Sequence, residues 1–197
     1  MPHYFSKKQD SELNLKKIKI VLKERTFELY SGSGIFSKDK VDNGTKLLLD
    51  TLDLSENTTV LDLGCGIGVI GIYVKMKYPS SNVFMSDVNK RAVSLAKKNI
   101  KLHKLTDIYV KESDSFSKID QNFDVILLNP PQTAGKDVCF NMIEESYKHL
   151  NKKGSFLLVA RHQKGGKHLS SKMEDIFSNV SDIAKGSGFR VYKSIKE

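Results

Sequence analysis

The chain has 197 residues, of which 39% are hydrophobic and 28% are charged. A chain of this length can bury one sizeable core, so we expect a single domain over residues 1–197. It has no apolar run long enough to cross a membrane and no signal-like N-terminal segment, so we expect a cytoplasmic protein, neither membrane-spanning nor secreted. Lysine and arginine outnumber aspartate and glutamate by 32 to 23. The resulting net charge of +9 favours a polyanionic partner such as RNA, but a merely lysine-rich soluble surface explains it equally well.

Residues 1–57 differ in pattern from the rest of the chain. Polar and apolar residues alternate over 15–30, which predicts a small hairpin. A glycine-rich segment, 31–44, follows, and the spacing of apolar residues over 45–52 predicts a short amphipathic helix. We interpret this part as an extension packed on the core that residues 58–197 form.

From residue 58 onward, apolar runs alternate with stretches of helical spacing. The apolar runs have few polar positions, which indicates strands buried on both faces of a parallel sheet covered by helices. The runs cover 58–66, 82–87, 107–111, 123–131 and 154–160, and the expected helices cover 69–78, 89–102, 136–150 and 165–177. Two last strands, 180–185 and 189–195, are joined by a Gly-Ser-Gly connection that predicts an antiparallel pair. The pattern therefore predicts a doubly wound α/β fold with an antiparallel pair at its C-terminal end.

The segment VLDLGCGIGVIG, residues 60–71, joins a predicted strand to a helix. Gly64, Gly66 and Gly68 permit a tight turn in which a ligand approaches backbone N–H groups closely. The glycine spacing also matches a dinucleotide fingerprint displaced into the helix, so a nicotinamide cofactor is one alternative. Asp62, two residues before the first glycine, would repel a pyrophosphate but suits the amino group of S-adenosylmethionine.

Acidic residues after two further strands are candidates for the rest of this cofactor. Asp87 ends a predicted strand, where its carboxylate can accept both ribose hydroxyls or simply cap the next helix. Asp114 follows the third strand and either accepts the adenine amine or is a solvated loop acid. The residues expected to bind S-adenosylmethionine are Asp62, Gly64, Gly66, Gly68, Asp87, Val88, Asp114 and Ser115.

The tripeptide Asn-Pro-Pro ends the fourth predicted strand, at the edge where such sheets bind ligands. Two prolines fix φ and remove N–H donors, which leaves carbonyl oxygens free to face a ligand. The Asn129 side-chain oxygen and the Pro130 carbonyl can then accept both hydrogens of an –NH2 group. An exocyclic amine of guanine or adenine held in this way directs its lone pair at a methyl donor, and positioning supplies most of the catalysis. We expect Asn129 and Pro130 to be the catalytic pair, although such a tripeptide can also merely end a strand.

These motifs together resemble a known family. VLDLGCGIGVIG, Asp87 and NPPQTAGK, with GIFSKDKVDNGTKLLL upstream, resemble the class I S-adenosylmethionine-dependent methyltransferases of the small-domain type. That family includes bacterial guanine-N-methyltransferases of ribosomal RNA. The resemblance implies a seven-stranded, mostly parallel Rossmann-like sheet, S-adenosylmethionine as the donor, and the Asn129–Pro130 pair as the grip on the amine.

The sequence departs from the family pattern at one position of the acceptor site. Many of these N-methyltransferases follow Asn-Pro-Pro with an aromatic residue that stacks on the target base, but here the residue is Gln132. Phe36 is a candidate to supply the missing stacking. The residues expected to bind the substrate are Phe36, Pro131, Gln132, Arg161 and Lys164. The last two form either a phosphate-binding strip or part of a solvated helix face.

The leading interpretation is methylation of a guanine amine in structured, ribosomal RNA. Two alternatives stay open: an N-methyltransferase acting on a protein glutamine amide or a small-molecule amine, and a non-catalytic RNA-binding module that retains the fold. No metal is expected, because His162 and His168 are too far apart for one helical face and no cysteine or carboxylate completes a set. The sequence leaves the oligomeric state open.

Overall fold

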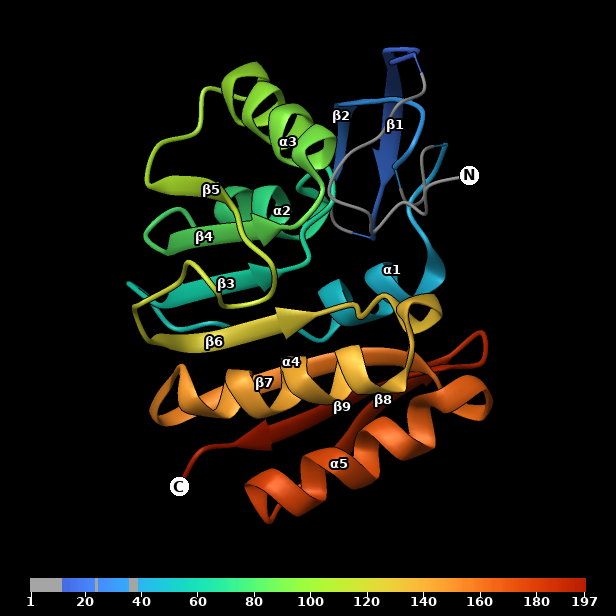
Figure 1. Cartoon of the computed structure of the whole chain (residues 1–197). Helices are drawn as coiled ribbons and strands as arrows, with labels where there is room; N and C mark the ends of the chain where they lie inside the picture. The colour runs from blue at the N-terminus through green and yellow to red at the C-terminus, as the bar shows by residue number, and fades with distance from the viewer. Residues whose placement is uncertain (1–11, 24, 36–38) are drawn as a thin grey trace.

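The computed structural model describes residues 12–23, 25–35 and 39–197. A seven-stranded sheet forms its centre (Figure 1), with the strand order β5-β4-β3-β6-β7-β9-β8. The parallel strands are β3 (Thr59–Leu63), β4 (Asn82–Asp87), β5 (Ile108–Glu112), β6 (Phe123–Leu128) and β7 (Leu150–Arg161). The antiparallel strands are β8 (Ser181–Gly186) and β9 (Phe189–Ile195). The predicted fold class, including the antiparallel pair at the C-terminal end, is confirmed.

Alternate residues of the central strands face two different cores. In β6, Val125 and Leu127 belong to one core, whereas Ile126 and Leu128 belong to the other. Side chains of α1 (Asn43–Asp50), α2 (Val69–Lys77) and α3 (Lys90–Leu102) fill the first core. Side chains of α4 (Lys136–Lys148) and α5 (Lys167–Phe177) fill the second, and Figure 1 shows these two helices together in front of the sheet. Both faces are covered, which explains why these strands read as continuous apolar runs.

The predicted N-terminal hairpin is also present, as β1 (Lys16–Val21) paired with β2 (Thr26–Ser31). Its inner face is apolar, with Ile18, Ile20, Phe27 and Leu29 buried in the same core as α1, α2 and α3. The helix expected over 45–52 is α1, which begins two residues earlier because Asp42 caps it by accepting a hydrogen bond from the Thr45 N–H.

The starts of two further elements differ from the prediction by two or more residues. β7 begins at Leu150 rather than at residue 154, because Leu150 already pairs with Phe123 of β6. The helix expected from residue 165 begins at Lys167, after a π-type turn over His162–Gly166. Gly165 has a φ of 103°, which no regular helix accommodates. Among the described residues, no helix is both long and apolar enough to span a bilayer.

The order of the strands places the ligand crevice. The chain builds outward from β3 to β5 and then returns to add β6 on the other side of β3. The loops that follow β3 and β6 therefore diverge at the carboxyl edge of the sheet, and this edge carries the arrowheads of these strands in Figure 1. Open α/β sheets bind ligands at such a switch point.

Candidate active site

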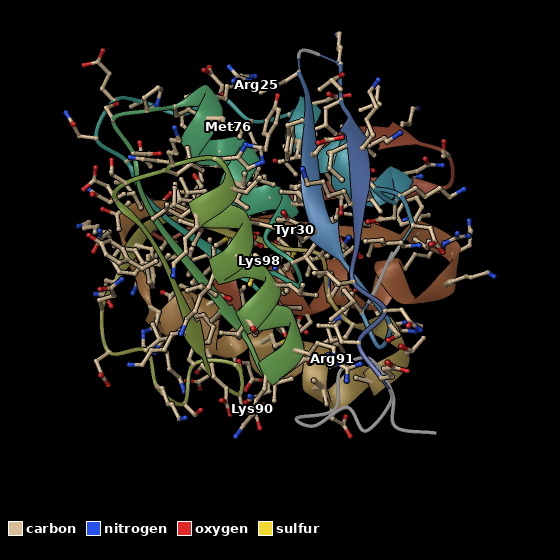
Figure 2. The ribbon with its side chains drawn as sticks, turned by 90° about the horizontal axis from the view of Figure 1, so that it is seen from above. Arg25, Tyr30, Met76, Lys90, Arg91 and Lys98 are labelled. Carbon is tan, nitrogen blue, oxygen red and sulfur yellow. The ribbon has the colours of Figure 1, made fainter. Side chains whose placement is uncertain are left out.

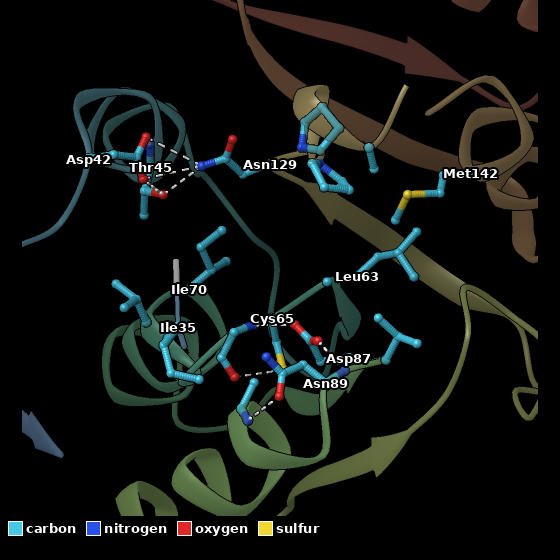
Figure 3. Close-up of a pocket in the computed structure, with 18 of the residues that line it drawn as sticks. Ile35, Asp42, Thr45, Leu63, Cys65, Ile70, Asp87, Asn89, Asn129 and Met142 are labelled. Atoms are coloured by element: carbon cyan, nitrogen blue, oxygen red, sulfur yellow. Dashed lines mark hydrogen bonds between the residues drawn. The ribbon is translucent and has the colours of Figure 1, made fainter. Parts of the chain in front are cut away.

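A cavity of about 1080 Å³ lies at this carboxyl edge. Its walls are formed by the loops after β3, β4, β5 and β6, the start of α1 and the inner face of β1 (Figure 3). The predicted site residues that line it are Gly64, Gly66, Asp87, Val88, Asp114, Ser115, Asn129, Pro130, Pro131, Arg161 and Lys164. Asp62 and Gly68 do not line it. Phe36 and the side chain of Gln132 lie outside the described part of the structure.

The glycine turn after β3 requires left-handed backbone. Gly64, Gly66 and Gly68 have φ values of 72°, 56° and 90°. A Cβ at Gly66 would meet no atom within 4 Å, so the cavity is open directly against the backbone of the turn. Gly68 instead occupies the N-cap position of α2, where a Cβ would lie 3.2 Å from Ile72. The first two glycines therefore border the ligand space, and the third shapes the start of the helix.

Asp62 lies behind the turn rather than at the cavity wall. Its side chain is buried, and one carboxylate oxygen accepts a 2.9 Å hydrogen bond from the Gly71 N–H. The other oxygen, Oδ1, has no partner among the described residues. Burial raises the pKa of Asp62 from 3.8 to about 7, opposed by the hydrogen bond from Gly71 and aided by the nearby Asp87. A cationic group that reaches Oδ1 would stabilise the ionised form.

Asp87 ends β4 and holds the turn together. Its Oδ2 accepts from the Gly66 N–H and its Oδ1 from the Asn89 N–H, both at 2.8 Å. Burial nevertheless raises the pKa of Asp87 above its usual value. Asn89 caps α3, because its side-chain oxygen accepts from the N–H groups of Arg91 and Ala92. The alternative that Asp87 merely caps this helix is therefore wrong, and its carboxylate faces the cavity.

Two serine hydroxyls beside Asp87 are buried without partners. Ser86 and Ser115 line the cavity, and neither hydroxyl has a hydrogen-bond partner among the described residues. Ser115 also has a φ of 48°, which is uncommon for a residue with a side chain. The exposed Asp114 lies beside it on the cavity wall. An unpaired buried hydroxyl is costly, so these atoms indicate polar groups supplied by a ligand.

On the opposite wall, the amide of Asn129 is held by α1. Its Nδ2 donates to Thr45 Oγ1 at 2.9 Å and lies 3.3 and 3.4 Å from the two carboxylate oxygens of Asp42 (Figure 3). The Thr45 hydroxyl donates to Asp42 Oδ2 at 2.6 Å, so its oxygen has to accept from Asn129. An ionised carboxylate cannot donate either. The amide nitrogen is therefore committed to α1, and its oxygen remains as a pure acceptor.

The two prolines that follow Asn129 differ in their carbonyls. The Pro131 carbonyl accepts from the Ala134 N–H at 2.7 Å within a short 3-10 turn, Gln132–Ala134. The Pro130 carbonyl accepts no hydrogen bond from the described residues. Among the described residues, neither the Asn129 oxygen nor the Pro130 carbonyl, the predicted acceptor pair, has a hydrogen-bond donor, and both residues line the cavity.

A cation and an aromatic ring form another part of the cavity wall. Arg161 at the end of β7 pairs across the sheet with Phe189 of β9, and its guanidinium lies 4.9 Å from the centre of that ring. Arg161, Lys164 and Phe189 all line the cavity. His162 turns aside and forms a 2.7 Å hydrogen bond with the Tyr192 hydroxyl. Within the described ranges, no group of His, Cys, Asp or Glu could hold a metal ion.

The contributors that sequence reasoning missed include Asp42, Thr45, Ser86 and Phe189. A helix-start signal was present for the first two, because Asp42 is followed by Asn-Gly and then Thr45 before an apolar run. That signal predicts a cap but not a partner, and Asn129 lies more than 80 residues further along the chain. Phe189 carries no local signal for a site, since its aromatic ring also fits a buried strand.

Comparison of the sequence with models of known protein families identifies the family of the chain. The model of the methyltransferase small domain matches residues 26–193. The chain belongs to the methyltransferase small-domain family. This confirms both the family resemblance and the prediction of a methyltransferase.

Members and neighbours of the methyltransferase small-domain family resemble the chain to different extents. The protein YbxB of Bacillus subtilis is 36% identical over 197 residues, which cover 98% of each chain. Ribosomal RNA small subunit methyltransferase C of Haemophilus influenzae (strain PittGG) is 33% identical over 96% of this chain but only 58% of its own length. The chain thus spans little more than half of that relative.

A solved structure shares the fold. The T. thermophilus 16S rRNA N2-guanine methyltransferase RsmC, in complex with AdoMet and guanosine, superposes with a TM-score of 0.83 at 21% identity. The match covers 95% of this chain and 52% of the T. thermophilus chain. At this identity the likeness establishes the shared fold.

Proposed function

We propose that the chain, acting as one domain in the cytoplasm, transfers a methyl group from S-adenosylmethionine to the exocyclic amine of a guanine in ribosomal RNA. The observation that carries the proposal is the fixed orientation of the Asn129 amide. Because Asp42 and Thr45 occupy its nitrogen, its oxygen can only accept, as a grip on an –NH2 group requires.

The glycine turn after β3 and the loops after β4 and β5 form one side of the cavity, which we call the turn side. Its residues fit the donor. S-adenosylmethionine, when bound, supplies an electrophilic methyl group on a sulfonium. Because Asp62 lies behind the glycine turn, a water molecule would have to connect the amino group of the donor to its buried Oδ1, which has no partner among the described residues. Asp87 can accept from the ribose hydroxyls, and the unpaired hydroxyl of Ser115 beside Asp114 suits the adenine ring. Backbone open to the cavity at Gly64 and Gly66 leaves room for close approach.

The opposite wall is formed by Asn129, Pro130 and the start of α1. Its residues fit the acceptor. The Asn129 oxygen and the Pro130 carbonyl accept the two hydrogens of the amine and turn its lone pair away from the conjugated ring. Holding the reacting atoms in line in this way accounts for roughly 7 kcal/mol or more in well-oriented systems. No base is required, since the extra proton of the product leaves to water. Arg161, supported by Phe189, stands where it can contact the base or a neighbouring phosphate.

The choice of ribosomal RNA rests on supporting observations of different kinds. The H. influenzae relatives are named as ribosomal RNA methyltransferases, and the T. thermophilus neighbour was solved with guanosine. The net charge of +9 favours a polyanion over a protein or a small amine.

The proposal is tested by incubating the purified chain with radiolabelled S-adenosylmethionine and, separately, ribosomal RNA, tRNA and total ribosomal protein. We expect label in ribosomal RNA, and digestion followed by mass spectrometry should identify guanosine methylated on its exocyclic amine. Label found only in protein would favour a glutamine amide as acceptor and reject the RNA assignment. Transfer to none of these acceptors, in a chain that binds the donor, would reject the proposed activity.

A further inference from the structure

The positive charge of the chain is concentrated in one structural unit. Residues 16–31, the β1–β2 hairpin, and 90–104, which are α3 and the two residues after it, contain 11 of the 32 Lys and Arg residues. They contain only two of the 23 Asp and Glu residues, so their net charge is +9, equal to that of the whole chain. The other residues balance at 21 of each sign. A generally lysine-rich surface would not produce this distribution.

The hairpin and α3 form one surface because buried polar contacts join them. Asn99 of α3 is fully buried, and its side chain accepts from the Tyr30 N–H at 2.7 Å and donates to the Tyr30 carbonyl at 3.0 Å. A ring nitrogen of His103 lies 2.7 Å from the Glu28 carbonyl of β2. Figure 2 looks onto this unit and shows the hairpin lying alongside α3, with Tyr30 and Lys98 near their junction. We call it the hairpin–helix surface.

All cations of the hairpin–helix surface except Arg91 are exposed. Lys16 forms an ion pair with Asp39, and Lys90 lies 3.9 Å from Glu112. Lys17 and Lys19 alternate along β1 with the buried Ile18 and Ile20, so they occupy its outer face. On α3, Lys97, Lys98 and Lys101 are exposed. The Lys17–Glu28 ion pair is loose, at 3.7 Å, and exposed, so it contributes little. Lys17 and Lys98 both lie over the Tyr30 ring, 5.5 and 4.6 Å from its centre.

The inner side of the same unit is a wall of the active-site cavity. Ile18 and Ile20 of β1, Asn89 at the cap of α3 and Ala92 in its first turn all line the cavity. Strand β1 therefore carries the cavity wall on one face and lysines on the other. A polyanion bound to the outer face is therefore held next to the cavity.

We propose that the hairpin–helix surface binds the phosphate backbone of the RNA that carries the target base. The proposal rests on the proposed function for the identity of the polyanion. Lysines along a strand and the helix beside it can follow a backbone without reading its sequence. The surface thus supplies affinity and placement, while the cavity selects the base.

The test replaces Lys17, Lys98 and Lys101 by glutamine in one triple variant. Binding to a fluorescently labelled ribosomal RNA fragment is measured by anisotropy from 50 to 300 mM salt. We expect the dissociation constant to rise at least about tenfold near 150 mM salt, and the slope of log affinity against log salt to flatten by about 2, because each lost phosphate contact removes released counterions. The KM for RNA should rise, with kcat nearly unchanged.

A matched triple variant, Lys152→Gln, Lys153→Gln and Lys185→Gln, removes the same charge from exposed positions on β7 and on β8 at the other edge of the sheet. It should bind RNA almost as the unaltered chain does. The proposal would be overturned if both variants weakened RNA binding equally or if the salt slope of the first variant stayed unchanged. It would also be overturned if the chain bound poly-L-glutamate rather than RNA. Thermal unfolding and donor affinity, unchanged in both variants, confirm that only the surface was altered. If the chain methylates RNA and the first variant binds RNA as the unaltered chain does, the RNA-binding role of this surface is rejected and the proposed function stands. If the surface binds RNA but the chain transfers no methyl group, only the proposed function is rejected.

Discussion

The two sides of the cavity differ in how their buried polar atoms are satisfied. On the turn side, Asp62 Oδ1 and the hydroxyls of Ser86 and Ser115 have no partners among the described residues. On the opposite side, the Asn129 nitrogen has partners on α1, and those partners are bonded to each other. One side is thus incomplete without a ligand, and the other is ordered before any ligand arrives.

This difference follows from what each side has to do. A buried polar atom without a partner costs on the order of 1–3 kcal/mol, and a ligand that supplies the partner recovers that cost as affinity. A group that acts on a weak nucleophile gains more from fixed orientation, since reorganisation during the reaction raises the barrier. We therefore expect changes on the turn side to affect donor affinity and stability, and changes on the other side to affect turnover.

The largest expected effect is that of Asn129→Ala. Removing the amide oxygen eliminates one acceptor of the amine, so kcat should fall by roughly 10²–10³, the range found when one such positioned group is removed. Donor affinity, measured by calorimetry, should stay within about twofold, because the turn side is untouched. Asp42 and Thr45 remain bonded to each other, which preserves the start of α1. Equal losses of turnover and donor affinity would show that Asn129 is structural.

The next effect concerns Asp62 and pH. Its pKa is about 7 in the folded chain against 3.8 when unperturbed, so between these values the folded state keeps a proton that the unfolded state loses. The free energy of unfolding without donor should therefore decrease, by a few kcal/mol, as pH rises from 5 to 8. Asp62→Asn should flatten this dependence in urea unfolding, whereas the exposed Asp53→Asn should not. A steep decrease that persists in Asp62→Asn would assign the pH dependence to another group.

A smaller effect is expected from Thr45→Val, which removes the hydroxyl that accepts from the Asn129 nitrogen. With its orientation held only by the longer contacts to Asp42, the amide should lose part of its alignment, and kcat should fall roughly tenfold. Thr51→Val is the matched control on the same helix, because the Thr51 hydroxyl bonds only to the Leu48 carbonyl at the far end. If both variants retained full turnover with unchanged KM, the orienting role of α1 would be refuted.

The smallest effect compares two neighbouring serines. Ser115→Ala removes a buried hydroxyl that has no partner among the described residues, so the free energy of unfolding without donor should rise by about 1 kcal/mol, while donor affinity falls a few-fold. Ser113→Ala should lower the free energy of unfolding and leave donor affinity nearly unchanged, because the Ser113 hydroxyl donates to the Ser115 carbonyl and accepts from the Lys118 N–H. Thermal unfolding and calorimetry on the two variants measure both quantities. The distinction between the two kinds of buried group fails if the variants behave alike.

Much of the fold was predictable because its signals are local. Strands buried on both faces read as apolar runs, glycines mark the turn where φ is positive, and Pro-Pro after Asn129 stops β6. The boundaries of β7 and α5 were less predictable, since pairing of Leu150 with β6 and the turn at Gly165 depend on neighbours in space.

The sequence by itself determined the fold class, the family and the strand-end residues that border the cavity in the glycine turn and the Asn-Pro-Pro motif, because their signals depend on positions a few residues apart. Only the tertiary structure decided that Asp62 lies behind the turn, that Asp42 and Thr45 orient Asn129, and that the surplus charge gathers on one surface. Each of these depends on contacts between segments far apart in the chain. Periodicity reports which face of an element is buried, but it carries no information on which distant side chain meets that face.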